Sequence, residues 1–179
     1  MHATFPSLQT SRLLLRQFLA ADTGMVYKGL SHPEVIKYYG VWYDSLEATS
    51  AQMRFFEDLE KNGTGIWWAV CSADNTVFYG ACGLNSLHRE HKKAEIGFWL
   101  LPEFWGKGII PEVVPLVCEY GFKYLGLHRI ESIIESENQN SKRVMAKLGF
   151  SYEGTMRECE IKHGKYISLD IFAKLNPEG

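Results

Sequence analysis

The feature that most constrains this chain is residues 94–114 (AEIGFWLLPEFWGKGIIPEVV), where an apolar strand leads into two glycines around a lysine and then a helix start. The first amides of a helix have no partner within it and carry a partial positive charge, so they bind phosphate readily. Gly106 and Gly108 lack a Cβ and let backbone amides approach a diphosphate, and Lys107 adds a charge. The segment predicts a diphosphate site of unspecified kind, although a lone GxG also ends many loops that bind nothing. The GxGxxG and GxxxxGKS/T patterns of other nucleotide sites are absent.

Strands and helices alternate along the chain, and no repeat or linker-like stretch divides it. Apolar runs bounded by turn residues predict strands at residues 12–17, 66–71, 76–85, 94–100, 129–135, 152–159 and 166–175. Apolar residues spaced three and four apart predict helices at residues 44–61, 109–124 and 138–149. Pro115 falls inside the second helix, where it is expected to cost about 3 kcal/mol or to kink the helix. Early hairpins and later helical crossovers predict a mixed α/β sheet in one domain, residues 1–179.

The balance of charge and hydropathy argues against several classes of protein. Of the 179 residues, 46% are hydrophobic and 22% are charged, as in an ordinary globular protein, and the net charge is -2. Without a basic surplus, neither a nucleic-acid nor a membrane partner is expected. The four cysteines form no CxxC pair, so no metal site and no disulfide framework are expected. Arg12 and Arg16 interrupt the apolar run near the N-terminus, which argues against a signal peptide and for a cytoplasmic protein.

Four separated motifs resemble the GNAT superfamily of N-acetyltransferases and occur in the order of that family. Residues 105–110 (WGKGII) fall on its diphosphate-binding loop, and residues 95–97 (EIG) fall on the strand before that loop. Residues 138–150 (NQNSKRVMAKLGF) match its N-x-x-S to K-x-G-F segment. The opening TSRLLLR (10–16) and the ending GTMRECEIKHGKYISLDIFAKL (154–175) are similar to the Rim-like branch, the ribosomal-protein-alanine N-acetyltransferase type.

The resemblance implies a GNAT-like fold, a twisted and mostly antiparallel mixed sheet of about six or seven strands flanked by helices. It also implies acetyl-coenzyme A (acetyl-CoA) as the acetyl donor, with no metal. Trp105 and Ile110 depart from the family's loop, which has Gln or Arg first and Gly or Ala last, so the phosphate donors are expected to be the amides of residues 106–110. The expected cofactor-binding residues are Phe98, Trp99, Leu100, Trp105, Gly106, Lys107, Gly108, Ile109, Ile110, Asn138 and Ser141.

The reaction that the resemblance implies is transfer of an acetyl group to a primary amine, with a protein N-terminal α-amine as the first choice of acceptor. At pH 7 roughly one α-amine in seven is neutral, against about one lysine amine in 2,500, so an α-amine asks less of a general base. The alternatives are a small-molecule amine (a polyamine, an amino acid or an aminoglycoside) and a non-catalytic acetyl-CoA-binding module. The sequence leaves open whether the protein is a monomer or a homodimer.

Glu95 is the carboxylate expected to act as general base, since alternate residues of its strand face opposite sides and one side can face a cleft. Glu135 and Glu160 are the competing carboxylates, and a solvated glutamate without a role is the alternative for Glu95. Many family members protonate the departing sulfur with a tyrosine, but that position is Met145 here. The resemblance implies that Ser141, one helical turn earlier, takes this role; its alternative is a helix-start serine that bonds to backbone.

Other residues also have both a functional and a purely structural explanation. Asn138 resembles the family's pantetheine-binding asparagine, and an asparagine at this position also caps a helix. Six aromatic residues are expected either to line the acceptor pocket or to fill the core: Tyr38, Tyr39, Trp42, Tyr43, Trp67 and Trp68. A basic stretch is expected to be a solvated loop, with steering of an acidic or phosphate-bearing partner, such as the phosphates of the cofactor, as the alternative: His88, Arg89, His91, Lys92 and Lys93.

Overall fold

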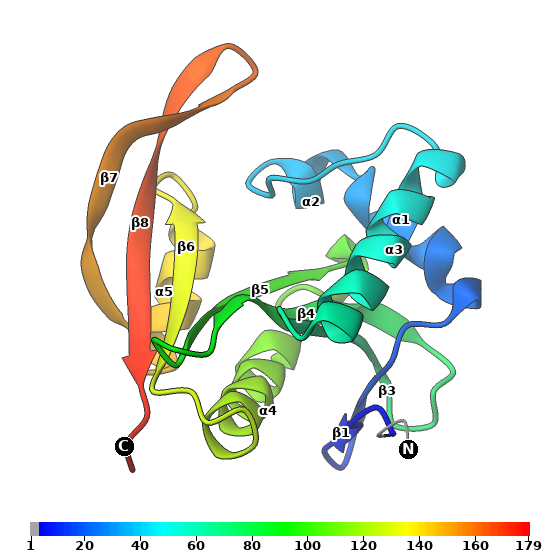
Figure 1. The fold of residues 1–179 in the computed structure, drawn as a ribbon. Helices are drawn as coiled ribbons and strands as arrows, with labels where there is room; N and C mark the ends of the chain where they lie inside the picture. The colour runs from blue at the N-terminus through cyan, green and yellow to red at the C-terminus, as the bar shows by residue number, and fades with distance from the viewer. Residues whose placement is uncertain (1–3) are drawn as a thin grey trace.

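The computed structural model describes residues 4–179, whose strands form one eight-stranded sheet (Figure 1). The strands are β1 (Leu8–Gln9), β2 (Leu13–Arg16), β3 (Ile66–Ser72), β4 (Phe78–His88), β5 (Lys93–Leu100), β6 (Arg129–Glu135), β7 (Ser151–Lys162) and β8 (Lys165–Leu175). The helices are α1 (Thr23–Leu30), α2 (Pro33–Ile36), α3 (Leu46–Asn62), α4 (Ile109–Lys123) and α5 (Gln139–Lys147). Two short 3-10 helices also occur: η1 (Ala20–Asp22) and η2 (Pro102–Phe104).

The strand order is β1-β2-β3-β4-β5-β6-β8-β7, and every neighbouring pair is antiparallel except β5 with β6. The mixed, mostly antiparallel sheet flanked by helices is thus confirmed. All of the strands and helices expected from the sequence are present, with bounds that differ by a few residues. The sequence predicts seven of the eight strands and misses β1, which has only two residues and is too short to show an alternating pattern. The sequence also does not predict α1 and α2, because such short helices owe their stability to packing rather than to local pattern.

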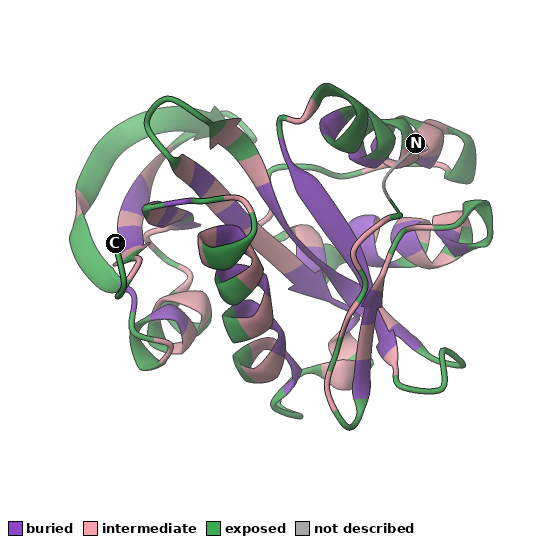
Figure 2. Cartoon of the chain, turned by 60° about the horizontal axis from the view of Figure 1, so that its bottom comes forward, coloured by how far each residue is buried: buried purple, intermediate pink, exposed green. Residues whose placement is uncertain are grey.

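Helices cover both faces of the sheet (Figure 1). On one face, Val113 and Val117 of α4 and Met145 of α5 are buried in a core with the sheet. On the other face, Val26 of α1 and Phe56 of α3 belong to a second core. Figure 2 shows that the central strands are largely buried, whereas β7, the last strand of the sheet, is exposed along most of its length.

Strands β5 and β6 pair briefly and then separate. Their pairing begins at Lys93 with Arg129 and ends at Glu95 with Glu131. Both strands continue past this point and diverge (Figure 1), and we call this divergence the fork. From residue 96 onward, the side of β5 that faces the fork therefore has backbone groups without a strand partner.

Helix α4 continues through Pro115 rather than ending there. A proline has no N–H to donate to the carbonyl one turn earlier, which is that of Pro111. Both residues are exposed, so water reaches this carbonyl and the proline ring stays outside the core. The position of Pro115 on the solvent side explains why the helix tolerates it.

Two glycines of α1 differ in what an added Cβ would meet. At Gly29 it would lie 2.2 Å from Cζ3 of Trp99, whereas around Gly24 the described residues place no heavy atom outside the local helix backbone within 4 Å. We expect Gly29→Ala to lower the free energy of unfolding by about 1–3 kcal/mol through overpacking. Gly24→Ala, the matched control in the same helix, is expected to raise it by about 0.5–1 kcal/mol, because alanine is the better helix former. Urea unfolding measures both values, and equal effects would contradict the packing of Trp99 against α1.

Candidate active site

The loop before α4 presents backbone amides that have no partner. Gly106 and Gly108 both have φ of +72°, a left-handed conformation that glycine adopts without strain. Within residues 4–179, the amides of Gly106, Lys107 and Gly108 donate no hydrogen bond, and the first amides of α4 have no acceptor inside the helix. Free donors therefore gather at the positive end of a helix, an arrangement suited to an anion.

Arg12, just before β2, binds the backbone carbonyls of this loop. Its guanidinium donates to the carbonyl of Lys107 at 3.3 Å and to the carbonyl of Gly108 at 3.2 Å. Its Nε also bonds Oε2 of Glu112 in the first turn of α4 at 2.7 Å. The loop carbonyls are thus occupied on the Arg12 side while the amides remain free. The sequence includes Arg12 in the TSRLLLR motif, but nothing in that motif indicates a contact with the loop.

The two residues that depart from the family's loop pattern have structural roles. The indole Nε1 of Trp105 donates to the carbonyl of Leu100 at 2.9 Å and ties the loop to the end of β5. The side chain of Ile110 packs against the core on the α4 side of the sheet, where Ile109 is buried. The branched side chain of Ile110 is therefore directed into the protein.

Three of the expected cofactor-binding residues lie on β5 beyond the fork. The side chain of Trp99 is buried in the core beneath α1 and α3. The side chains of Phe98 and Leu100 pack with the opposite core. The backbone of these residues, rather than their side chains, is what faces the gap.

Asn138 and Ser141 meet at the start of α5. The amide of Ser141 donates to Asn138 Oδ1 at 3.1 Å, so Asn138 caps the helix as expected. Asn138 Nδ2 donates to Ser141 Oγ at 3.0 Å. Because this hydroxyl accepts from Asn138 and bonds no other described residue, its own hydrogen is free to be donated.

A buried carboxylate fixes α5 to the sheet. Oδ2 of Asp170 lies 2.5 Å from Nζ of Lys142, and Oδ1 accepts from the hydroxyls of Ser136 and Thr155 at 2.6 Å each. Burial raises the pKa of Asp170, but the bonds from Lys142, Ser136 and Thr155 outweigh it, so the pKa is lowered overall. Asp170 therefore stays ionised and holds in place the helix that begins with Asn138.

Glu95 lies at the point where β5 leaves β6. Its neighbours Ala94 and Ile96 are buried on the α4 side, so Glu95 faces the side covered by α1 and α3, which we call the acceptor side. Burial raises the pKa of Glu95, and the charges of Glu131 and Glu160 raise it further. A carboxylate of this kind is a stronger base than an exposed glutamate.

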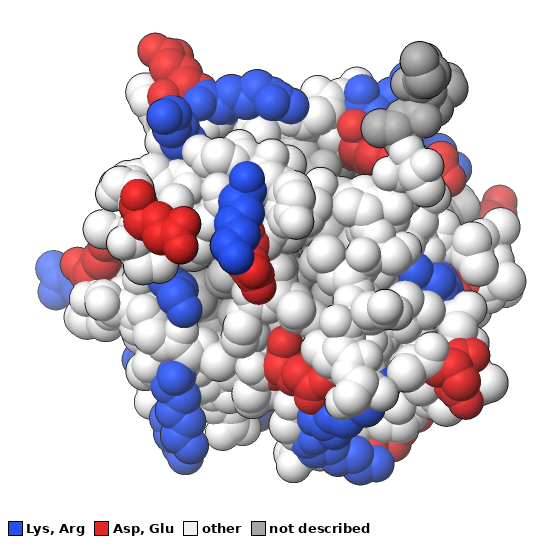
Figure 3. Space-filling view, turned by 90° about the horizontal axis from the view of Figure 1, so that it is seen from below, with Lys and Arg blue, Asp and Glu red and all other residues white. Residues whose placement is uncertain are grey.

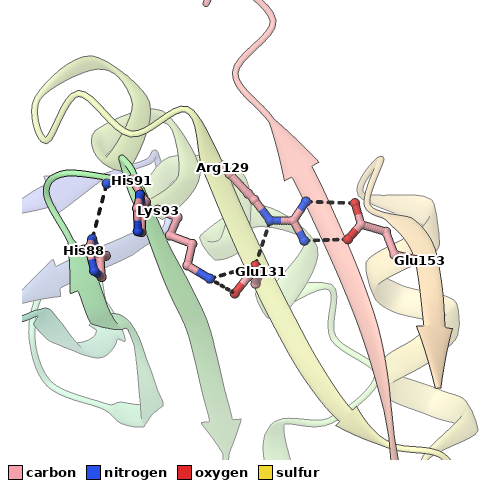
Figure 4. A network of polar contacts seen from close by, with 6 residues as sticks. All are labelled: His88, His91, Lys93, Arg129, Glu131 and Glu153. Atoms are coloured by element: carbon pink, nitrogen blue, oxygen red, sulfur yellow. Dashed lines mark hydrogen bonds and ion pairs between the residues drawn. The ribbon is translucent and has the colours of Figure 1, made fainter. Parts of the chain in front are cut away.

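The other carboxylates near Glu95 differ in whether a cation already binds them. Glu131 accepts from Arg129 Nε at 2.7 Å and lies 3.4 Å from Lys93 Nζ (Figure 4). Arg129 also binds both oxygens of Glu153 on β7, so this network ties three strands together at the closed end of the fork. Glu135 is also paired, with its Oε1 2.5 Å from the Lys162 ammonium, whereas Glu160 is exposed on β7 and has no ion pair among the described residues.

The aromatic residues divide between the two faces of the sheet. Trp67 packs on the acceptor side, in contact distance of Gly83 and Gly97, while Trp68 is buried on the α4 side. Trp68 is therefore core and does not line the acceptor side. The phenol of Tyr39 has a raised pKa, chiefly because of burial and to a smaller extent because of nearby charges that include Glu95.

Charged side chains of both signs are intermixed over the underside of the molecule (Figure 3). The basic turn between β4 and β5 is exposed, as expected, and its His88 and His91 rings stack with centroids 4.2 Å apart (Figure 4). Among residues 4–179, no helix is long and apolar enough to cross a membrane, and no group of three or more His, Cys, Asp or Glu side chains is arranged to hold a metal ion.

A family profile described as acetyltransferase (GNAT) domain matches residues 12–151. The chain belongs to the GNAT acetyltransferase family. The uncharacterized N-acetyltransferase YoaA of Bacillus subtilis (strain 168) is 33% identical to it over 174 residues, which cover 97% of this chain and 98% of YoaA. The resemblance inferred from the motifs is thus confirmed. This GNAT protein is an acetyl-CoA-dependent N-acetyltransferase, and the alternative of a non-catalytic module is set aside.

Solved GNAT structures share the fold at low sequence identity. RimL, a ribosomal L7/L12 α-N-protein acetyltransferase in complex with coenzyme A, matches with a TM-score of 0.86 and 19% identity over 95% of this chain and 98% of RimL. A spermidine N-acetyltransferase from Vibrio cholerae, in complex with CoA and spermine, matches with a TM-score of 0.82 and 22% identity over 93% of this chain and 96% of that one. The fold is therefore shared by enzymes that act on protein and on small-molecule amines.

The raised pKa of Glu95 predicts a pH-dependent effect on stability. Because the folded-state pKa lies above the unfolded value of about 4.3, the ionised side chain destabilises the fold at neutral pH, and this penalty disappears below the unfolded pKa. We expect Glu95→Gln to unfold at a higher temperature than the parent at pH 7, with the difference shrinking as the pH falls toward 4.

Glu153→Gln is the matched control, and we expect it to change the stability at pH 7 in the opposite direction. The Arg129 bond lowers the pKa of Glu153, so this carboxylate stabilises the fold above its unfolded pKa and less as the pH falls. We expect the variant to be less stable than the parent at pH 7 and equal to it in acid. Thermal unfolding measured from pH 8 to well below pH 4, where the lowered pKa of Glu153 is crossed, tests both variants. Stability changes of the same sign at pH 7 would contradict the burial of Glu95.

Proposed function

We propose that acetyl-CoA lies with its diphosphate on the amides of residues 106–110 and its pantetheine arm along the open side of β5. The support is the conjunction of two features: unbonded amides at the start of α4 and unpaired β5 backbone beyond the fork. Both need hydrogen-bond partners that the described chain does not supply. A diphosphate fits the first and an amide-bearing chain fits the second. We assign Asn138 and Ser141, at the start of α5, to the pantetheine end of the same ligand.

When bound, acetyl-CoA supplies an activated thioester, and the chain supplies the proton transfers. We assign Glu95 as the group that accepts the proton of the acceptor amine, directly or through one water. Its raised pKa strengthens it for this role. Ser141 hydrogen-bonds to the departing sulfur through its free hydroxyl hydrogen and passes it a proton, and the serine regains a proton from solvent water. Backbone amides of residues 98–100 bind the carbonyl oxygen as negative charge develops on it.

We infer that the acceptor is a protein N-terminal α-amine. An α-amine is neutral far more often than a lysine amine at pH 7, so one carboxylate suffices as base. The fold shared with RimL, an α-N-protein acetyltransferase, is consistent with this choice. A small-molecule amine is the second candidate, because the unpaired carboxylate of Glu160 suits a cation and because the spermidine enzyme shares the fold as well.

We also infer that residues 1–179 form one acetyltransferase domain and that the protein works in the cytoplasm. The single sheet carries both hydrophobic cores. Cys71, Cys82, Cys118 and Cys159 are all free thiols, which fits a reducing compartment.

The diphosphate site can be tested with a pair of glycine variants. Gly106 and Gly126 have similar φ of +72° and +66°, and neither has a heavy atom of the described chain within 4 Å of an added Cβ, apart from its chain neighbours. Gly106→Glu adds a negative charge to the proposed phosphate site and is expected to weaken coenzyme A binding by tenfold or more, roughly the effect of one lost charge contact. Gly126→Glu carries the same backbone strain and should bind as the parent does. Calorimetric titration measures both, and equal affinities would place the diphosphate elsewhere.

The acceptor and the base can be tested together by thiol release. We expect the parent to turn over short peptides with a free N-terminus and Glu95→Gln to lose about 10²–10⁴ in kcat/KM at pH 7. Glu160→Gln, the competing carboxylate, should retain most of the activity. Coenzyme A affinity is measured in parallel so that binding and chemistry are separated. Loss in Glu160→Gln with full activity in Glu95→Gln would exchange the two roles, and turnover of diamines without turnover of peptides would favour the second candidate.

A further inference from the structure

Lys162, at the end of β7, connects the end of α2 with the end of β6 on the acceptor side. Its ammonium donates to the carbonyl of Lys37 at 2.7 Å and lies 3.5 Å from the carbonyl of Ile36. It also lies 2.5 Å from Oε1 of Glu135 at the end of β6. The side chains of Lys162 and Glu135 are only 19% and 14% exposed, so this is a formed contact rather than a loose surface pair.

The contact lies at the open end of the fork. Glu135 is on the same face of β6 as Glu131, four residues further along, which is about 13 Å in a strand. The carbonyls that Lys162 binds end α2, and the chain leads from there directly to Tyr39, whose phenol lies near enough to Glu95 to be affected by its charge. The ammonium therefore sits on the acceptor side, beside a residue four positions along β6 from Glu131, which pairs with the proposed base.

The charges of the acceptor side show where a second positive charge of a ligand could bind if Lys162 did not already occupy the place. Glu131 is bound by Lys93 and Arg129, while Glu95 and Glu160 have no cation partner among the described residues and flank the place proposed for the reacting amine. Glu135, together with the two carbonyls of α2, would make a cation site of three oxygens. In this protein the site is filled by the chain's own lysine.

We propose that Lys162 is a specificity-determining residue that excludes acceptors with a second positive charge at the distance of Glu135. This inference rests on the proposed function, and it narrows the acceptor to a single amine followed by an uncharged chain, such as a peptide N-terminus without an early lysine or arginine. A polyamine would bring its distal ammonium against the ammonium of Lys162, and such repulsion discriminates between ligands that otherwise bind alike.

The test compares acceptors that differ in one charge. Two peptides with the same N-terminus, one with lysine and one with norleucine at the third position, are assayed beside spermidine and butylamine. The readout is the ratio of kcat/KM for the dicationic peptide to that for the monocationic one. In Lys162→Met, which keeps the apolar stem and removes the charge, the oxygens around Glu135 become available, and we expect the ratio to rise by about tenfold or more.

The controls separate charge from structure. Lys165 pairs with Lys162 across the β7–β8 hairpin and has no ion pair among the described residues, so Lys165→Met should keep the parental ratio. Lys162→Arg keeps the charge and should keep the ratio as well. Adding Glu135→Gln to Lys162→Met should abolish the gain, because the carboxylate that would bind the second cation is removed. Glu135→Gln alone leaves the charge of Lys162 unpaired and should lower the ratio. This variant tests the proposal independently if Lys162→Met does not fold.

The possible failures are distinguishable. If the parent turns over peptides but Lys162→Met keeps the parental ratio and the parental coenzyme A affinity, the role of Lys162 is wrong and the proposed function stands. A parent that prefers spermidine to butylamine also overturns the role of Lys162. A parent that turns over no peptide overturns the proposed acceptor and this inference with it.

Discussion

The separation of β5 from β6 after three residue pairs is the constraint on which the rest of the site depends. Parallel strands that stay paired have no free backbone groups, whereas the fork leaves one side of β5 open within the sheet. The closed end of the fork is held by charge: Glu131 is bound by Lys93 and Arg129, and Arg129 reaches on to Glu153 of β7. Glu95 lies where the pairing ends, so the same geometry that opens the strand also places a carboxylate beside the gap.

Two further contacts, both between residues far apart in the sequence, orient the groups around the fork. Arg12 binds the carbonyls of Lys107 and Gly108 from the other side of the loop, which leaves the amides at the start of α4 free. Asp170 holds Lys142 and so fixes the helix that presents Asn138 and Ser141. Both are charge-assisted bonds, which are shorter and stronger than neutral ones and hold a defined geometry. They position the site without belonging to the groups proposed to react.

The number of glutamates on the acceptor side matters less than which of them are already bound by a lysine or arginine of the chain. Four glutamates face this region, yet Glu131 and Glu135 are already bound by cations of the chain. The unpaired carboxylates are Glu95, whose pKa burial raises, and Glu160. A count of acidic residues would suggest a site for polycations, whereas the pairing leaves room for one ammonium at the fork. Specificity in this arrangement comes from which charges remain unpaired.

The sequence by itself determined the family, the strands and helices with strong periodicity, and the loop at residues 106–110, because each depends on a local pattern of glycines, apolar spacing or caps. It also identified Glu95 and Ser141 as candidates from their places in motifs. Only the tertiary structure decided that β5 and β6 diverge, that Trp68 is core, and that Arg12 and Lys162 reach across the chain. These depend on contacts between residues distant in the sequence, 36 positions apart for β5 with β6 and 100 or more for Arg12 and Lys162, which no local pattern records. The short helices α1 and α2 belong with them, since packing against the rest of the protein rather than their own sequence stabilises them.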